Sequence, residues 1–335
     1  MTLMLSKSEV GHHLVMEELI NEMEAGFLAF ADGKVDMPQR IRVATKSGDG
    51  YGAFMPCYMP DKGLGIKINT NFRDNTDYGL PRILGLMVLL DTDTGMPLAI
   101  MDSTAITAFR TAAVSGVAMR CLSRENSEVL GILGAGVLSI PHMLATGAVR
   151  RIRVIRIYSP SLSTRQEEFV RAARASTGAA VEVVRSAEQA VAGADIVVTC
   201  TSSTSPVLDG QWLEPGTCVV AVGNASPISR ELDTLTVMRS RVVCDSWRAC
   251  ILEAGDLLIP IKEGSITDSR IKHDLGDFLQ QKDLPTETSE VVLFKSVGLA
   301  FEDLIAARYV YSKAVSSRAA VQFEFFDATL KAIAN

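Results

Sequence analysis

The sequence predicts an α/β fold that contains a doubly wound parallel sheet, and two observations carry this prediction. An apolar run from Val129 to Leu133 enters Gly134-Ala135-Gly136, and a helical pattern follows at once. Beyond it, short apolar runs alternate with helical patterns as far as residue 245. Because parallel strands need crossover connections, this alternation indicates a parallel sheet whose ligands bind at the carboxyl ends of its strands.

The glycine turn has the strand–turn–helix setting of a dinucleotide-binding fingerprint. Gly134 permits the tight turn, and Gly136 lets the backbone approach a pyrophosphate. Val137 follows, and the N–H groups of the next helix receive the phosphates. The third small position is Ser139 instead of glycine, which still allows close packing of helix on strand. A glycine-rich turn without a ligand is the alternative.

Composition indicates an ordinary globular protein with room for two cores. The chain has 335 residues, of which 47% are hydrophobic and 21% charged. Its net charge of −6 and the absence of a dense Lys/Arg block argue against a nucleic-acid partner. No apolar run reaches the length of a membrane span, no signal pattern opens the chain, and the cysteines lack metal spacing. We expect a metal-free, cytoplasmic protein without a membrane partner.

The part of the chain before the glycine turn has a different pattern. Residues 9–33 predict one helix that ends at Asp32-Gly33. From 37 to 90, short strands broken by turns predict a mainly antiparallel sheet, and the runs 84–90 and 96–100 predict a hairpin. The alanine-rich segment 102–122 predicts a helix that leads into the glycine turn.

After the glycine turn the expected elements complete the parallel sheet. Strands are expected at 152–158, 181–184, 195–200, 217–222 and 242–245, with helices at 163–176 and 186–192. Residues 290–298 predict a last strand and turn, and 299–316 an amphipathic helix. The tail 323–334 fits a strand or a helix.

The end of the second of these strands bears on the choice of cofactor. NAD enzymes usually present an acidic residue there to the ribose 2′-hydroxyl. Here no carboxylate appears before Glu167, whereas Ser159, Ser161 and Arg165 are suited to a 2′-phosphate. Arg165 is alternatively an ordinary surface residue. We therefore expect NADP(H) in preference to NAD(H), with NAD(H) still open.

Three stretches of the chain carry a family resemblance. They are Ile106–Ser115 (ITAFRTAAVS), Ile132–Val137 (ILGAGV) and Phe294–Asp303 (FKSVGLAFED). Together they resemble the ornithine cyclodeaminase/mu-crystallin family of NAD(P)-dependent enzymes, and the likeness covers nearly the whole chain. The family implies a Rossmann dinucleotide-binding domain, 121–304, inserted into a discontinuous α+β domain, 1–120 plus 305–335. The family also implies that this first domain binds substrate and forms a homodimer.

The family's carboxylate-binding trio matches Arg40, Lys67 and Arg110, of which Lys67 and Arg110 are the expected catalytic residues. Amino- and imino-acid substrates carry a carboxylate, to which arginine offers bidentate donors and lysine a compact charge. Arg110 lies mid-helix among small apolar residues, an unusual place for an unpaired cation. A structural ion pair is the alternative for Arg110 and Lys67. Arg42 would share a strand face with Arg40, which makes the role of Arg40 less distinct.

The resemblance also assigns later strand ends to the dinucleotide, namely Thr201, Ser202, Val222, Asn224, Ser296 and Gly298. Two positions depart from the cyclodeaminases, which carry a glutamate just before the Met-Pro step and an acidic residue after the glycine of a strand-end loop. This chain has Ala53 at the first position and Gly223-Asn224-Ala225 in the loop. Without those carboxylates, the proton transfers that close the ornithine ring lack their expected agents.

The non-cyclising branch, with its ketimine reductases and amino-acid dehydrogenases, therefore fits better. We expect reversible NAD(P)H-dependent reduction of a small α-imino acid to an L-amino acid. One alternative is a cyclodeaminase that uses Asp61, Asp74 or Asp77, and another is a non-catalytic NADPH-binding protein. A second anionic subsite for a dicarboxylic imine is conceivable among Tyr51, Arg73, Ser226, Arg230 and Arg248.

Overall fold

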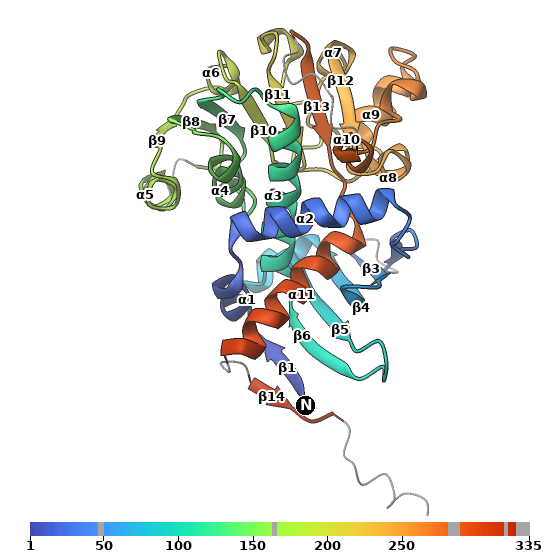
Figure 1. Cartoon of the computed structure of the whole chain (residues 1–335). Helices are drawn as coiled ribbons and strands as arrows, with labels where there is room; N and C mark the ends of the chain where they lie inside the picture. Colours follow the sequence, from blue (N-terminus) through green and yellow to red (C-terminus); the bar gives the residue numbers. More distant parts are fainter. Residues whose placement is uncertain (46–49, 163–165, 281–288, 318–320, 326–335) are drawn as a thin grey trace, which may run out of the picture. The chain divides into compact units, whose positions relative to one another are not determined.

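A computed structural model describes residues 1–45, 50–162, 166–280, 289–317 and 321–325 (Figure 1). By its internal contacts the chain divides into two compact units. The first comprises residues 1–15, 33–107 and 300–335, and the second 16–32 and 108–299. Residues 16–32 and 108–120 of the expected first domain lie in the second unit, and residues 300–304 of the expected Rossmann domain lie in the first. The division crosses helix α3 (Ser103–Leu122) after Thr107.

The first unit is built on a seven-stranded sheet in the order β14-β1-β6-β5-β4-β3-β2. Its elements are β1 (Thr2–Leu5), α1 (Lys7–His13), β2 (Ile41–Ala44), β3 (Gly50–Met59), β4 (Gly63–Phe72), the 3₁₀ helix η1 (Arg73–Tyr78), β5 (Ile83–Leu90), β6 (Pro97–Asp102), α11 (Ala300–Ser317) and β14 (Val321–Phe323). The antiparallel pairing of β5 with β6 confirms the expected hairpin. β1 was not predicted, and it pairs parallel with β6 and antiparallel with β14. Residues 326–335, which include most of the tail, lie outside the described residues.

Strand β3 is longer than the short strands expected between residues 37 and 90, and it runs through Pro56. The strand is continuous, and Pro56 pairs with Ile66 of β4. On the other edge, pairing with β2 ends at Phe54, and the backbone of Tyr58 bonds to Asp36. The missing N–H of Pro56 falls between these two bonded positions, so proline removes no ladder hydrogen bond there.

The single helix expected over 9–33 is two helices, α1 and α2 (Met16–Ala31). Ser6 and Glu9 form a capping box that starts α1 two residues before the expected point. Leu14 then adopts an extended conformation with φ −82° and ψ 109°, which interrupts the i→i−4 hydrogen bonds. The apolar spacing continues across this break, so the pattern alone did not reveal it.

The second unit contains a seven-stranded sheet in the order β12-β13-β11-β10-β7-β8-β9, and every neighbouring pair is parallel. Its strands are β7 (Val129–Leu133), β8 (Val154–Tyr158), β9 (Ala180–Val183), β10 (Ile196–Thr199), β11 (Cys218–Ala221), β12 (Ser240–Cys244) and β13 (Val291–Lys295). The order reverses at β7 and β10, so this is the predicted doubly wound sheet with its switch point beside the glycine turn.

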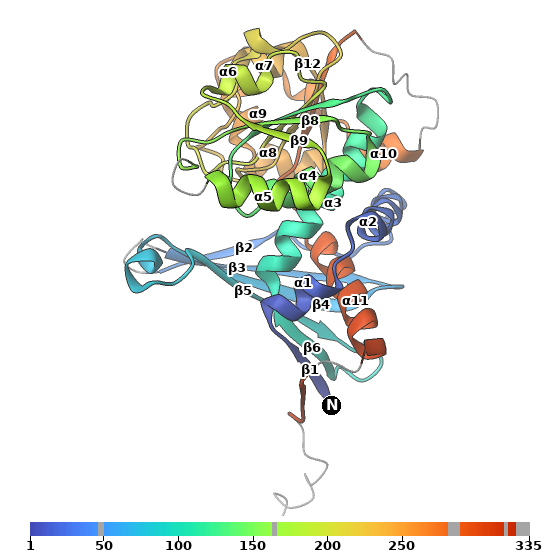
Figure 2. The same ribbon diagram turned by 90° about the vertical axis from the view of Figure 1, so that its left-hand side faces the viewer.

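Helices pack on both faces of this sheet. They are α4 (Ser139–Val149), α5 (Gln166–Thr177), α6 (Ala187–Val191), α7 (Thr234–Arg239), α8 (Trp247–Glu253), α9 (Gly255–Lys262) and α10 (Leu275–Gln280), with the 3₁₀ helices η2 (Gly210–Trp212) and η3 (Asp268–Ile271). Figure 2 shows α4 and α5 together beneath the sheet and α6 and α7 above it.

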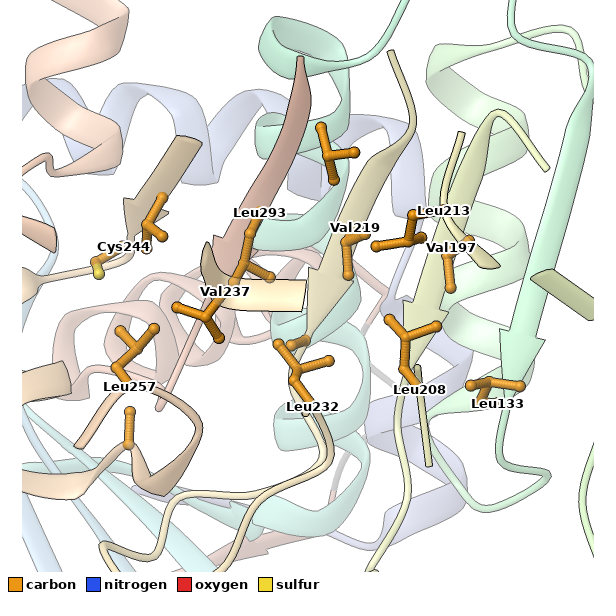
Figure 3. Close-up of a cluster of buried hydrophobic side chains, with 14 of the residues drawn as sticks. Leu133, Val197, Leu208, Leu213, Val219, Leu232, Val237, Cys244, Leu257 and Leu293 are labelled. Carbon is orange, nitrogen blue, oxygen red and sulfur yellow. The ribbon is translucent and has the colours of Figure 1, made fainter. Parts of the chain in front are cut away.

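On the α6–α9 face, side chains from four adjacent strands form one apolar core (Figure 3). Leu133, Val197, Val219 and Leu293 come from β7, β10, β11 and β13 and are at most 1% exposed. Complete burial of each such side chain contributes roughly 1.5–3 kcal/mol. This core fixes the level at which the strands end, and with it the position of the strand-end loops.

Candidate functional site

The predicted fingerprint turn joins β7 to α4 in the second unit. Gly134 has φ +115°, and its N–H donates to the carbonyl of Tyr158 at 2.9 Å. A Cβ atom at this position would lie 2.8 Å from the carbonyl oxygen of Cys200. Only glycine satisfies both the backbone conformation and the close approach of β10.

The start of α4 has the features of an anion-binding helix end. Gly136 and Val137 are exposed, and a Cβ added to Gly136 would meet no atom within 4 Å. The N-cap residue Leu138 supplies no side-chain hydrogen bond to the first turn. The exposed turn and the positive end of the helix dipole therefore fit a dinucleotide pyrophosphate. Within the first helical turn, the N–H of Ser139 donates to the carbonyl of Gly136 at 3.1 Å, and Pro141 has no N–H.

The end of β8 places two hydroxyl groups together. The Oγ atoms of Ser159 and Ser161 are 3.1 Å apart, and Ser161 is exposed. Arg165, the third group expected at a 2′-phosphate, lies outside the described residues. The two serines follow Tyr158, whose carbonyl holds the fingerprint glycine, so they adjoin the same turn.

The ends of β10 and β11 are joined by one buried carboxylate that the sequence analysis did not single out. Glu231 accepts hydrogen bonds from the N–H of Thr201 at 2.6 Å, its hydroxyl at 2.8 Å and the N–H of Gly223 at 2.8 Å. Its side chain is fully buried, and burial raises the pKa of its carboxyl group. Glu231 thus fixes both strand-end loops that were predicted to line the dinucleotide.

The ion pair between Lys295 and Asp256 is buried next to Glu231 and holds its backbone. Lys295 donates to the carbonyl of Asn224 at 2.8 Å, and its Nζ lies 2.7 Å from Oδ2 of Asp256. Oδ1 of Asp256 accepts the backbone N–H groups of Glu231 at 2.7 Å and Leu232 at 2.9 Å. Burial disfavours the charge of Lys295, but Asp256 and Glu231 outweigh it and raise the pKa of the ammonium group.

The remaining predicted cofactor residues follow along the same edge. Ser202 is exposed beside Thr201, and the N–H of Val222 donates to the carbonyl of Thr199 at 3.0 Å. The side-chain amide of Asn224 donates to the carbonyl of Ser203 at 2.9 Å. Ser296 donates to Asp245 at 2.8 Å.

Arg110 also lies at this edge and is only 5% exposed. Gly298 has φ +81°, and a Cβ there would lie 2.5 Å from Nη1 of Arg110. The guanidinium group therefore lies against the loop that follows β13. The structure thus brings Gly134, Thr201, Asn224, Ser296, Gly298 and Arg110 to the carboxyl edge of one sheet.

Lys67 and Arg40 belong to the first unit. Lys67 is 1% exposed in β4, and its Nζ lies 2.6 Å from Oδ2 of Asp303 in α11. Cys57 of β3 is buried beside this pair. Its burial, and to a smaller extent the negative charge of Asp303, raise the pKa of its thiol to about 12. The ion-pair alternative for Lys67 is therefore present, with Asp303 as the partner.

Arg40 was expected to lie in a strand together with Arg42, and this expectation is wrong. It precedes β2, which begins at Ile41, so it does not share a strand face with Arg42. The Arg42 guanidinium instead lies 5.5 Å from the centre of the Tyr51 ring. Arg40 is half-buried, and it remains the candidate from this segment for binding the substrate carboxylate.

The residues considered for other roles have local contacts. Arg230 bonds to Thr234 at 3.0 Å and contacts Glu263 at 3.4 Å. Arg248 lies 5.5 Å from the centre of the Trp247 ring. Asp61, Asp74 and Asp77, the alternative proton carriers, are all exposed. Within the described part of the chain, no cluster of His, Cys, Asp and Glu could hold a metal ion, and no helix is long and apolar enough to cross a membrane.

Four buried acidic residues near the candidate site residues were given no role from the sequence. Glu231, Asp245, Asp256 and Asp303 are fully buried. Asp303 ends one of the stretches that carried the resemblance, but its partner Lys67 is distant in sequence, as Lys295 is from Asp256. The available signal was a carboxylate among apolar or small neighbours, which requires a partner because an isolated buried charge is costly.

Comparison with known proteins agrees with this arrangement. Residues 1–318 match the model of the ornithine cyclodeaminase/mu-crystallin family. The ketimine reductase mu-crystallin of Mus musculus is 33% identical over 312 residues, 92% of this chain and 96% of the relative.

Two solved structures share the whole fold. The Thermococcus litoralis Delta(1)-pyrroline-2-carboxylate reductase, in complex with NADH and L-proline, is 35% identical with a TM-score of 0.91, and the match covers 96% of this chain and 100% of that one. An archaeal alanine dehydrogenase, a dimer with bound NAD, is 30% identical with a TM-score of 0.88, and the match covers 97% and 99% of the two chains. The chain belongs to the ornithine cyclodeaminase/mu-crystallin family.

Proposed function

We propose that this protein is an NAD(P)-dependent oxidoreductase that reversibly reduces a small α-imino acid to the L-amino acid. The observation that carries the proposal is the buried Arg110 guanidinium at the carboxyl edge of the dinucleotide-binding sheet. A cation at this edge suits a carboxylate whose α-carbon must face a nicotinamide. Family relatives that act as ketimine and pyrroline-2-carboxylate reductases support the same reaction.

The proposed reaction does not require a strong general acid or base from the protein. The reduced nicotinamide, when bound, supplies a hydride to the C=N carbon, and the imine nitrogen takes up a proton. Arg40, Lys67 and Arg110 hold the substrate carboxylate, and Lys67 also polarises the imine or relays the proton. Asp303 holds the Lys67 ammonium group in one buried position. Orientation of the two reacting carbons supplies most of the rate enhancement.

We propose NADPH as the preferred cofactor. The hydroxyl groups of Ser159 and Ser161 lie 3.1 Å apart at the end of β8, and the chain from Tyr158 to Leu162 contains no carboxylate that would repel a 2′-phosphate. The Thermococcus litoralis relative is described with NADH. The ratio of kcat/KM with the two cofactors therefore tests this preference directly.

A homodimer formed through the first unit completes the proposal. The inner face of β3 buries Ala53, Met55, Cys57 and Met59, whereas the opposite face of the sheet is apolar and exposed. Its exposed members include Ile41, Val43, Tyr58, Leu64, Leu84 and Leu86, at 37–55%. A contiguous apolar face of this kind marks an interaction surface, and the dimeric alanine dehydrogenase relative supports a second copy as its partner.

Turnover assays test the activity. NADPH and NADH oxidation are followed with pyruvate, glyoxylate and oxaloacetate, each with ammonia or methylamine, and with pyrroline-2-carboxylate. Oxidation with at least one imine is expected, and Arg110→Met should lower kcat/KM at least 100-fold. Ammonia release from ornithine without net cofactor turnover would identify a cyclodeaminase instead. Tight NADPH binding without turnover would identify a binding protein.

A further inference from the structure

The side chain of Asp245 gathers the loop that follows β13. This residue comes directly after β12 and is fully buried. Its Oδ2 atom accepts hydrogen bonds from the hydroxyl of Ser296 at 2.8 Å and from the N–H groups of Val297 at 2.8 Å and Gly298 at 2.7 Å. Three donors on one oxygen fold the loop into a single tight conformation.

The other carboxylate oxygen is held as well. Oδ1 of Asp245 accepts the N–H of Ser246 at 2.7 Å and lies 3.5 Å from Sγ of Cys250. The backbone N–H of Asp245 donates to the carbonyl of Lys295 at 3.0 Å. The carboxylate is thus fixed from both sides, so it can act as a rigid anchor for the loop.

The loop in turn defines the position of Arg110. Gly298 needs its positive φ of +81° to follow the path set by Asp245. Its Cα approaches the guanidinium group so closely that a methyl group would lie 2.5 Å from Nη1, 2.7 Å from Nη2 and 3.0 Å from Cζ. The backbone of residues 296–298 is therefore in close contact with the guanidinium group. If that backbone moves, either the guanidinium group moves with it or a gap opens between them.

We propose that Asp245 is a positioning residue for the imine reduction, which holds Arg110 in the rotamer that binds the substrate carboxylate by fixing the 296–298 loop against the guanidinium group. The inference rests on the proposed function, because it assigns Arg110 the substrate carboxylate. Asp245 does not contact the substrate itself. Replacement of Asp245 should therefore raise the KM for the imino acid, and this increase should require Arg110.

The chain offers a matched control in Asp195, which makes the same kind of contact at the opposite edge of the same sheet. Its Oδ2 accepts the N–H groups of Glu128 at 2.8 Å and Val129 at 2.9 Å, and its Oδ1 pairs with Arg124 at 2.6 Å. Substitution of either aspartate by asparagine exchanges one acceptor oxygen for an NH₂ donor. Both variants should lose stability, but only one of them alters the loop beside Arg110.

The test compares Asp245→Asn with Asp195→Asn in urea unfolding, in NADPH binding by fluorescence and in steady-state kinetics with pyrroline-2-carboxylate. Asp245→Asn should raise the KM for the imine at least 10-fold, and Asp195→Asn less than 2-fold. In an Arg110→Lys background, Asp245→Asn should add less than 2-fold, because the two residues act through one contact. Ser296→Ala removes a single donor and should raise the KM about 3-fold, should Asp245→Asn not fold.

Equal KM changes in the two asparagine variants, or full additivity with Arg110→Lys, would overturn the inference while the reductase activity stands. A wild-type chain that neither turns over nor binds any imino or amino acid would overturn the proposed function and this inference together. NADPH affinity that falls in parallel with the KM change would show that the loop serves the cofactor instead of Arg110, which also refutes the proposal.

Discussion

Replacement of Lys295 by methionine tests whether the buried charges beneath the strand-end loops hold the second unit together. Methionine matches the length of lysine but removes the ion pair with Asp256 and the hydrogen bond to Asn224, at 2.7 and 2.8 Å. Loss of one partner of a buried pair typically costs about 3–5 kcal/mol. The equilibrium constant for unfolding should therefore rise by roughly 10² to 10⁴.

The structure also predicts a partial rescue. In the double variant Asp256→Asn/Lys295→Met, the asparagine oxygen still accepts the N–H groups of Glu231 and Leu232, and no unpaired charge remains at Asp256. At least half of the lost stability should return. Urea unfolding followed by far-UV circular dichroism measures both variants. A single variant that loses less than about 1 kcal/mol, or a double variant no more stable than the single one, would refute this account of the charges.

Leu86→Asp, a charge on the open sheet face, should give monomers in sedimentation analysis, and an unchanged dimer would exclude that face. Lys67→Met, which breaks the pair with Asp303, should lower kcat/KM for the imine at least 100-fold, and full activity would remove Lys67 from the mechanism. Ser161→Asp should lower the NADPH/NADH ratio of kcat/KM at least 10-fold, and a constant ratio would remove the serines from cofactor choice. Burial lowers the pKa of His142 to about 4, so unfolded chains take up its proton first as the pH falls below about 6.5. Stability should therefore fall by about 3 kcal/mol towards pH 4, and His142→Gln should flatten this dependence in urea titrations.

The parallel sheet and its fingerprint turn were predictable because their signals are local. The central strands β7, β10 and β11 are almost entirely apolar, and Gly134 combines a positive φ with a close approach of the chain after β10. Strand β1 was not predictable in this way. It has only four residues, and its partners β6 and β14 lie far along the chain. The break at Leu14 was missed because apolar spacing does not record a change of helix axis.

The cations of the candidate site could be singled out from the sequence, whereas the buried carboxylates, among them the Asp303 partner of Lys67, could not. A lysine between two isoleucines, or an arginine among alanines, is unusual enough to suggest a role, and the family resemblance proposes carboxylate binding. The partners of such groups are set by the fold alone. Asp303 reaches Lys67 because α11 packs on β4. Glu231 reaches Thr201 in a loop after β11 whose backbone bonds to Val207 and Leu208. Sequence spacing carries no information about either contact.

The proposed reaction moves a hydride from a reduced nicotinamide to the α-carbon of an imino acid. An isotope experiment follows this hydride, with cofactor deuterated at C4 of the nicotinamide and either pyrroline-2-carboxylate or a 2-oxo acid with ammonia. Mass spectrometry and NMR of the product should find the deuterium at the α-carbon of an L-amino acid. Product without the label, or no product while ornithine releases ammonia, would contradict the proposed reaction.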